Sequence, residues 1–281
     1  AASSKAGGGI KGRMFAWSAK QARAYSLASE KTFGPGPFKK IRHGIADALV
    51  LKKIRSILGP NLRYIVSGGA PLATDLAHFY AGMGITLIQG YGLSETTGPI
   101  AVQHIGKNPV GGVGLPLPGN FIKIAKDGEI LVRGQSVMPG YYHLPEQTAE
   151  VMPDGKWFHT GDLGSIDRKG QLTITGRKKE LIVTAGGKNV SPEILEESLS
   201  THPLIANIIV VGDNRPYIGA LIALDTEMLP EWLATHGLPV MDAAQAANLP
   251  EVRDSLEKAI ARANKAVSRA ESIRRYRIVN A

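Results

Sequence analysis

The spacing of apolar residues changes along the chain and predicts helices first, then a parallel sheet, then hairpins. Helical spacing runs from Met14 to Ala28 and again through the basic segment 38–58, and the sequence GPGP at residues 34–37 separates the two. The second helix is predicted to end at Gly59–Pro60. The leading residues 1–12, AASSKAGGGIKG, are small and polar and predict a flexible lead-in.

Two apolar runs flank a helical pattern in residues 62–89. The runs LRYIVSGG (62–69) and ITLIQ (85–89) predict buried strands, and the residues from 72 to 82 predict a helix. A strand–helix–strand unit of this length favours a parallel sheet. Ligands of such sheets gather at the carboxyl ends of the strands, where SGGAP (67–71) and GYGLSETTG (90–98) are expected to face one crevice.

The rest of the chain predicts hairpins and then a small α+β domain. Residues 106–176 are rich in glycine and β-branched residues, with hairpins expected around Asp127–Gly128 and Lys169–Gly170. Beyond Arg177 the pattern predicts a helix at Pro192–Ser200 capped by Ser191, strands in ANIIVVGD and IGALIALD, and helices near 227–235 and 251–268. The predicted class is therefore α/β with mixed α+β character, divided into domains 1–176 and 177–281.

Composition narrows the function classes. The chain has 281 residues, 43% of them hydrophobic, and no cysteine, which excludes disulfides, thiolate metal sites and cysteine nucleophiles. No run of 18 apolar residues and no secretion-signal pattern is present, so a cytoplasmic location is predicted.

The net charge of +9 is distributed unevenly. Residues 1–65 hold 13 Lys and Arg against two acids, whereas residues 66–281 are slightly acidic. A basic segment of this kind favours anionic surfaces and leaves a peripheral contact with the inner membrane face open, although a solvated helical face is the simpler interpretation. Aromatic residues are too sparse there for stacking on bases, so no nucleic-acid partner is predicted.

The loop GYGLSETTG carries the residue types of a nucleotide site. Its glycines allow a ligand to approach the backbone, and the hydroxyls of Ser94, Thr96 and Thr97 can contact phosphate. Glu95 is a hard oxygen ligand of the kind that Mg²⁺ uses beside substrate phosphates, and Tyr91 can stack on a base. By itself the loop is equally compatible with a polar turn that binds nothing.

Three further segments add candidate chemistry. HTGD (159–162) places Asp162 where it can accept ribose hydroxyls, or can simply cap a turn; His159 lacks a triad partner and is taken as structural. GRKKE (176–180) offers Arg177 to phosphate or ribose oxygens, with a solvated charged face as the alternative. AGGKNVSP (185–192) is a glycine turn with Lys188, for which nothing else in the sequence supports a Schiff-base role.

Five motifs in order carry a resemblance to a known family. These are SGGAPL, GYGLSETTG, GEILVRG…MPGYY, WFHTGDLGSID and GQLTITGRKKELIVTAGGKNVSPEILE. In this order and spacing, over about 61–225, the chain resembles the adenylate-forming enzymes and, among them, bacterial long-chain fatty-acyl-CoA synthetases. The resemblance implies that residues 1–176 are the C-terminal part of a large AMP-binding domain, with a parallel sheet and a β-rich subdomain. Residues 177–281 would be a small, hinged C-terminal domain.

The resemblance also implies a reaction and its residues. A fatty carboxylate attacks the α-phosphate of ATP, and coenzyme A then displaces AMP to give the thioester. ATP or AMP, Mg²⁺ and coenzyme A are the implied small molecules, and some family members are dimers, which leaves a homodimer open. Lys179 is implied as the hinge, Glu95 as the Mg²⁺ ligand and Thr96 as a phosphate contact, whereas Asp162 and Arg177 would hold ribose. Other nucleotide and coenzyme A positions are implied for Gly68, Gly69, Ala70, Gly90, Tyr91, Gly92, Gly186 and Gly187.

The chain also departs from the family pattern. The glycine- and Ser/Thr-rich phosphate loop that ends in Pro-Lys-Gly is absent, and no segment matches the late catalytic Lys. We therefore expect a C-terminal portion, truncated at both ends, that binds AMP or acyl-AMP weakly and does not catalyse adenylation alone.

Other functions stay open at this point. A fatty-acyl-AMP ligase or a peptide-synthetase adenylation domain would share the motifs. A noncatalytic module for nucleotide or lipid surfaces, or an unrelated α/β binding protein, would share the composition.

Overall fold

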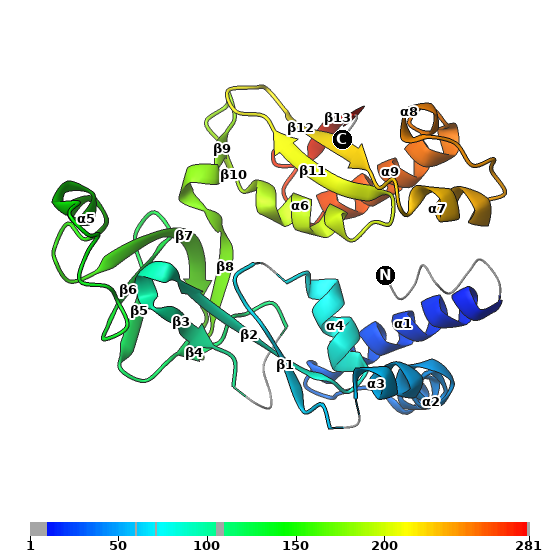
Figure 1. Cartoon of the computed structure of the whole chain (residues 1–281), viewed down its shortest axis with the longest axis horizontal. Coiled ribbons are helices and arrows are strands. Elements are labelled where there is room, and N and C mark those ends of the chain that lie inside the picture. The colour runs from blue at the N-terminus through cyan, green and yellow to red at the C-terminus, as the bar shows by residue number, and fades with distance from the viewer. Residues whose placement is uncertain (1–9, 60, 71, 105–109, 280–281) are drawn as a thin grey trace. The chain divides into compact units, whose positions relative to one another are not determined.

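The computed structural model describes residues 10–59, 61–70, 72–104 and 110–279 (Figure 1). The chain divides into two compact units, one built on residues 14–175 and the other on residues 176–281. Each unit is described by itself. The predicted flexible lead-in falls largely on residues 1–9, outside the described residues, as does Pro60.

The first unit begins with helices that the GPGP sequence interrupts as predicted. These are α1 (Ile10–Ser29), α2 (Pro37–Ala46), the π-helical turn η2 (Asp47–Leu51) and α3 (Lys52–Leu58). Small residues let α1 pack closely on helix α4 (Thr74–Gly82), because a β-carbon at Gly82 would lie 2.0 Å from the Ala22 carbonyl oxygen. Ala22, Ala46, Leu51, Met83 and Ile85 form the apolar core of this region.

The first sheet contains the predicted parallel pair. Strand β1 (Tyr64–Ser67) runs parallel to β2 (Thr86–Leu93), with α4 as the crossover, so this expectation is confirmed. The predicted end of the second strand at Gln89 is wrong. Strand β2 continues to Leu93 because it pairs there with antiparallel β3 (Gly98–Val102), and β4 (Leu115–Pro116) completes the sheet.

A glycine contact makes the β2–β3 hairpin possible. A β-carbon at Gly92 would lie 2.0 Å from Gly98 O, so the two strands pass at a distance that only glycine permits. The pairing register shifts between Tyr91 and Gly92, which is a β-bulge, and the single turn η3 (Ser94–Thr96) connects the strands.

The second sheet contains both predicted hairpins. Its strands are β5 (Asn120–Ile124), β6 (Glu129–Gly134), β7 (Phe158–Ile166) and β8 (Leu172–Arg177), in that order, with α5 (Pro145–Val151) before β7. The two sheets share one apolar core, formed by Tyr91, Ile100, Ala101, Val113, Ile130, Val132, Phe158 and Leu172. This core fixes β2 beside β6 and β7.

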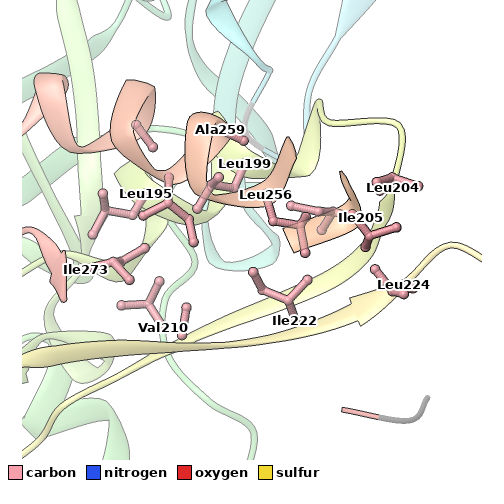
Figure 2. Close-up of a cluster of buried hydrophobic side chains, with 14 of the residues drawn as sticks. Leu195, Leu199, Leu204, Ile205, Val210, Ile222, Leu224, Leu256, Ala259 and Ile273 are labelled. Atoms are coloured by element: carbon pink, nitrogen blue, oxygen red, sulfur yellow. The ribbon is translucent and has the colours of Figure 1, made fainter. Parts of the chain in front are cut away.

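The second unit is a small sheet covered by helices. Its first elements are η4 (Lys178–Glu180), β9 (Ile182–Val183), β10 (Asn189–Val190), α6 (Pro192–Ser200), β11 (Ile205–Val211) and β12 (Ile218–Leu224). Helices α7 (Leu229–Thr235), α8 (Ala243–Ala246) and α9 (Pro250–Ala263), turn η5 (Asn264–Ala266) and strand β13 (Ile273–Val279) follow. Figure 2 shows side chains of α6 and α9 packed against those of β11 and β12.

Two details of this unit differ from the predictions. Helix α6 has the predicted bounds, but the Ser191 hydroxyl makes no capping hydrogen bond. Strand β13 was missed, because its sequence IRRYRIV is dominated by charge, and its parallel pairing with β12 is decided by contacts distant in sequence.

The buried imidazole of His202 makes the second unit sensitive to acid. Its Nε2 lies 3.2 Å from the Ser255 hydroxyl on α9, and burial, assisted by the positive charge of Arg262, lowers the pKa of His202 to about 4. Because an unfolded histidine titrates near pH 6.5, the unfolded chain binds more protons between these pH values. Stability is therefore lost as pH falls from about 6.5 to about 4.

We expect His202→Gln to flatten this part of the stability profile, since glutamine retains a polar contact but does not titrate. Urea unfolding followed by Trp232 fluorescence, with Trp17 and Trp157 replaced by Phe, measures the slope between pH 5 and pH 7. An equal slope in variant and parent would contradict the assignment to His202.

Candidate active site

A buried hydrogen bond joins two of the sequence motifs. The Tyr91 hydroxyl on β2 donates to Oδ2 of Asp162 on β7 at 2.6 Å, and the two residues are only 7% and 6% exposed. The bond spans 71 positions in sequence and connects the two sheets at the shared core. GYGLSETTG and HTGD therefore belong to one site.

The HTGD segment is not the tight turn that the sequence predicts. It lies inside β7, where the pairing register with β6 shifts: Glu129 pairs with Leu163, and Leu131 pairs with His159. The extra residues form a bulge, and Gly161 takes a positive φ of 74°. A bulge redirects side chains, and this one places Asp162 against Tyr91.

A second buried carboxylate, Glu129, holds this bulge. Its Oε1 accepts a hydrogen bond from the Gly161 amide at 3.0 Å, and its Oε2 lies 3.1 Å from Nδ1 of His159. Thr160 adds two contacts, donating to Ile130 O and accepting from the Asp162 amide. The structure thus gives His159 a structural partner.

Glu129 was missed by sequence reasoning. It is 4% exposed and begins the apolar strand GEILVRG, so an acid entering a buried strand was the available signal.

The hydroxyls of the SETT segment have different surroundings. Thr96 is fully buried, and its Oγ1 accepts from the Leu93 amide at 2.9 Å and donates to Gly98 O at 2.7 Å. Thr97 has a φ of 54° and donates to Ser136 O. Ser94 is exposed. The predicted phosphate contact by Thr96 would require its hydroxyl to leave the turn, whereas Ser94 already faces solvent.

Glu95 presents a half-buried carboxylate on the same turn. Its Oε1 accepts a hydrogen bond from the Tyr141 hydroxyl at 2.9 Å. Burial and this hydrogen bond raise the pKa of Tyr141 above its ordinary value, so Tyr141 stays a donor. Among the described residues no cluster of three His, Asp or Glu side chains forms a metal cage. One carboxylate suits Mg²⁺, which retains waters and binds substrate phosphates.

The glycine turns at the strand ends lie side by side. A β-carbon at Gly68 would lie 3.2 Å from Gly90 O, so the end of β1 touches the middle of β2. Gly69, with a φ of 81°, and Ala70 are exposed beyond this contact. Gly68, Gly69 and Ala70 therefore lie next to Gly90 and Gly92, as the parallel pair predicted.

A cavity of about 260 Å³ lies on the other side of β2. Leu72, Ala77, Ala81, Ile85 and Leu87 supply its apolar lining, with Gln89 and Gln103 among its polar groups. Gln103 bridges this wall, accepting from the Gln89 amide and donating to Gly112 O.

The other predicted site residues belong to the second unit. Arg177 ends β8 with a side chain 64% exposed, and its Nη1 lies 3.8 Å from Oε1 of Glu180. Lys179 is exposed in η4.

The Gly186–Gly187 turn joins β9 to β10. Gly187 has a φ of 76°, and its amide donates to Thr184 O. Lys188, next to this turn, has its Nζ 3.4 Å from Oε1 of Glu271, which gives it an ion-pair role.

Two family models match this chain. The AMP-binding enzyme model covers residues 19–142, and the model of the AMP-binding enzyme C-terminal domain covers residues 179–281. The chain belongs to the AMP-binding enzymes. The adenylate-forming family predicted from the five motifs is thereby confirmed.

Curated relatives of this AMP-binding enzyme include long-chain-fatty-acid–CoA ligases. The FadD15 ligase of Mycobacterium bovis is 50% identical over 273 residues, which cover 96% of this chain and 45% of the relative. The human ligase ACSBG1 is 35% identical over 231 residues, 80% of this chain and 31% of the relative. The chain thus spans less than half the length of these relatives.

Solved structures show the same fold. The A-PCP didomain of carboxylic acid reductase from Segniliparus rugosus, in complex with AMP, has a TM-score of 0.63 at 23% identity, covering 94% of this chain and 36% of that one. The O-succinylbenzoate coenzyme A synthetase of Bacillus subtilis, in complex with ATP and magnesium ion, has a TM-score of 0.58 at 24% identity, covering 82% and 46%. These likenesses confirm the mixed α/β fold class.

Removing the phenol should destabilise the first unit of this AMP-binding enzyme. We expect Tyr91→Phe to cost about 1–3 kcal/mol of unfolding free energy, because a buried carboxylate loses a hydrogen-bond donor. Urea unfolding measures it, with Tyr142→Phe, at an 85% exposed tyrosine, as the control. Equal effects at the two positions would contradict a structural role for the Tyr91–Asp162 bond.

The two neighbouring hydroxyls should behave differently. We expect Thr96→Val to cost about 1–3 kcal/mol, because the Leu93 amide loses its acceptor, and Ser94→Ala to change stability by less than about 0.5 kcal/mol. Thermal unfolding monitored by circular dichroism compares the two. A neutral Thr96→Val would mean that the turn does not depend on this hydroxyl.

Proposed function

We propose that this chain carries the adenylate-binding part of a long-chain-fatty-acid–CoA ligase. The supporting observation is the buried Tyr91–Asp162 bond, which brings the predicted ribose acceptor to the strand that carries Glu95. The names of the relatives support the acid–thiol ligase class and fatty-acid metabolism. Because the chain spans 45% of its mycobacterial relative, the activity of the whole protein is part of this proposal.

The proposed reaction has two displacements. A carboxylate oxygen attacks the α-phosphorus of ATP, the bond to pyrophosphate breaks, and an acyl-adenylate forms. The sulfur of coenzyme A then attacks the acyl carbon, and the carbon–oxygen bond to AMP breaks. Such chemistry depends on positioning and on stabilising negative charge, which needs few reactive side chains.

Asp162 is proposed to accept hydrogen bonds from the ribose hydroxyls. The Tyr91 hydroxyl fixes one carboxylate oxygen, and the Glu129–Gly161 contact fixes the backbone behind it, so the acceptor is oriented before nucleotide binds. With a ring only 7% exposed, Tyr91 would act mainly through Asp162. The backbone of Gly68, Gly69, Ala70, Gly90 and Gly92 would then supply most of the adenine contact.

The phosphate side is proposed to lie at the SETT turn. Glu95 would hold Mg²⁺, which neutralises phosphate charge when bound, and the exposed Ser94 hydroxyl would approach the phosphate more readily than Thr96.

In the second unit we retain Lys179 as the proposed hinge and Arg177 as the contact to ribose or phosphate. The Gly186–Gly187 turn stays beside the proposed path of coenzyme A. The exposure of Arg177 and Lys179 is compatible with these roles.

Partners and location follow the same proposal. Fatty acid, ATP and coenzyme A are the proposed substrates, and a homodimer and a cytoplasmic location remain predictions. In the part of the chain that the structure describes, no helix is long and apolar enough to cross a membrane. A peripheral contact through the basic residues 1–65 is therefore the form of membrane association to consider.

Nucleotide affinity tests the ribose assignment. We expect the 281-residue chain to bind AMP, and Asp162→Asn to weaken binding about tenfold or more, because hydrogen bonds to a charged acceptor are lost. The exposed Asp75 offers a matched control as Asp75→Asn. Isothermal titration calorimetry of each protein with AMP and with 2′-deoxy-AMP gives the result.

The deoxynucleotide separates a ribose contact from an indirect effect. The parent chain should prefer AMP to 2′-deoxy-AMP, and Asp162→Asn should lose this preference. Failure of the parent to bind either nucleotide would refute the proposed site, and an unchanged preference in the variant would assign the ribose contact to another residue.

A further inference from the structure

The helices between residues 37 and 58 turn their large apolar side chains outward. Phe38, Ile41 and Ile45 are 66%, 62% and 48% exposed, and Leu49 continues the row into η2 at 46%. Spacings of three and four residues place them on one side of the helix, and we call these four residues the apolar stripe. A helix that served only the core would bury this stripe.

The opposite side of α2 attaches it to the rest of the unit through small and polar groups. Ala46 is fully buried, and Nε2 of His43 lies 2.6 Å from Gly82 O. The His43 ring also stacks on Tyr25, with 4.0 Å between ring centroids. An Arg55–Asp47 ion pair at 2.6 Å ties α3 to η2. The stripe is thus held outward by a fixed attachment on the other side.

Positive charge surrounds the stripe. Residues 31–59 contain one acid, Asp47, which pairs with Arg55, and their net charge is +6. The Arg42 guanidinium lies 4.5 Å from the centre of the Phe38 ring, so charged and apolar groups share one face. The remaining cations of the segment are exposed: Lys31, Lys39, Lys40, Lys52 and Lys53.

We propose that the apolar stripe and its cations dock on the surface of an anionic lipid bilayer, with α2 lying in the plane of the interface. Helices of this kind bury Phe, Ile and Leu at the boundary between headgroups and acyl chains while Lys and Arg meet acidic headgroups. Each basic residue near such a surface contributes to attraction that salt screens. A second copy of the chain is disfavoured as the occupant, because two segments of +6 would face each other.

This docking goes beyond the ligase proposal and does not depend on it. Vesicle binding needs no nucleotide and no turnover, so either idea can fail alone. If both hold, the docked helix would bring the enzyme to the phase into which long-chain fatty acids partition.

Co-sedimentation with sucrose-loaded vesicles tests the surface. The 281-residue chain should sediment with vesicles of phosphatidylcholine mixed with phosphatidylglycerol, not with phosphatidylcholine alone, and added salt should release it. We expect Lys39→Glu/Lys40→Glu and Phe38→Ser/Ile41→Ser each to lower partitioning about tenfold or more.

Matched variants identify the surface. Lys126→Glu/Lys169→Glu changes the net charge equally at exposed lysines elsewhere, and Tyr142→Ser/Val240→Ser removes exposed apolar groups elsewhere. Both should bind vesicles as the parent does. Circular dichroism confirms that every variant is folded.

A single introduced tryptophan then reports insertion. Phe38→Trp, with the three natural tryptophans replaced by Phe, should be quenched by brominated lipid in the anionic vesicles, and Val240→Trp in the same background should not. The proposal is overturned if the parent ignores anionic vesicles, if the control pairs weaken binding equally, or if the fluorescence of the Phe38→Trp variant is not quenched. It is also overturned if the stripe variants only convert a dimer to a monomer in light scattering.

Discussion

The first unit depends on compensating two carboxylates buried between its sheets. A buried, ionised carboxylate is costly unless donors surround it. Asp162 receives the Tyr91 hydroxyl, and Glu129 receives the Gly161 amide and faces His159. These contacts require a bulge in β2 and another in β7, and the shared apolar core holds the bulged strands together. The candidate site and the stability of the unit therefore rest on the same hydrogen bonds.

This economy suits an enzyme that binds and orients a nucleotide more than it supplies reactive groups. The phenol of Tyr91 and the amide of Gly161 fix Asp162 in one orientation, so little has to be ordered when ligand arrives. Thr96 closes the neighbouring turn from inside and leaves Ser94 and Glu95 toward its outer side. The loop thus divides its hydroxyls between folding and function.

A second kind of surface lies on the helices that precede the sheet. There the buried contacts are made by Ala46 and His43, and large apolar side chains with cations meet solvent. Together with a nucleotide site on strands, the unit joins a basic, apolar face to a polar cleft, which are the two surfaces that an enzyme acting on amphiphilic acids requires.

The sequence by itself determined the order of elements, the parallel β1–β2 pair, both hairpins of the second sheet and the family, because periodicity, turn residues and motif spacing are local properties. Only the tertiary structure decided that β2 extends to Leu93, that HTGD is a bulge, that Thr96 points inward and that Glu129 supports Asp162. Each of these depends on a partner supplied by another strand, and strand β13 is defined in the same way by β12. Likewise, helical spacing predicted an amphipathic segment at 38–58, but which of its faces meets the protein was decided by the close packing at Gly82, Ala22 and Ala46.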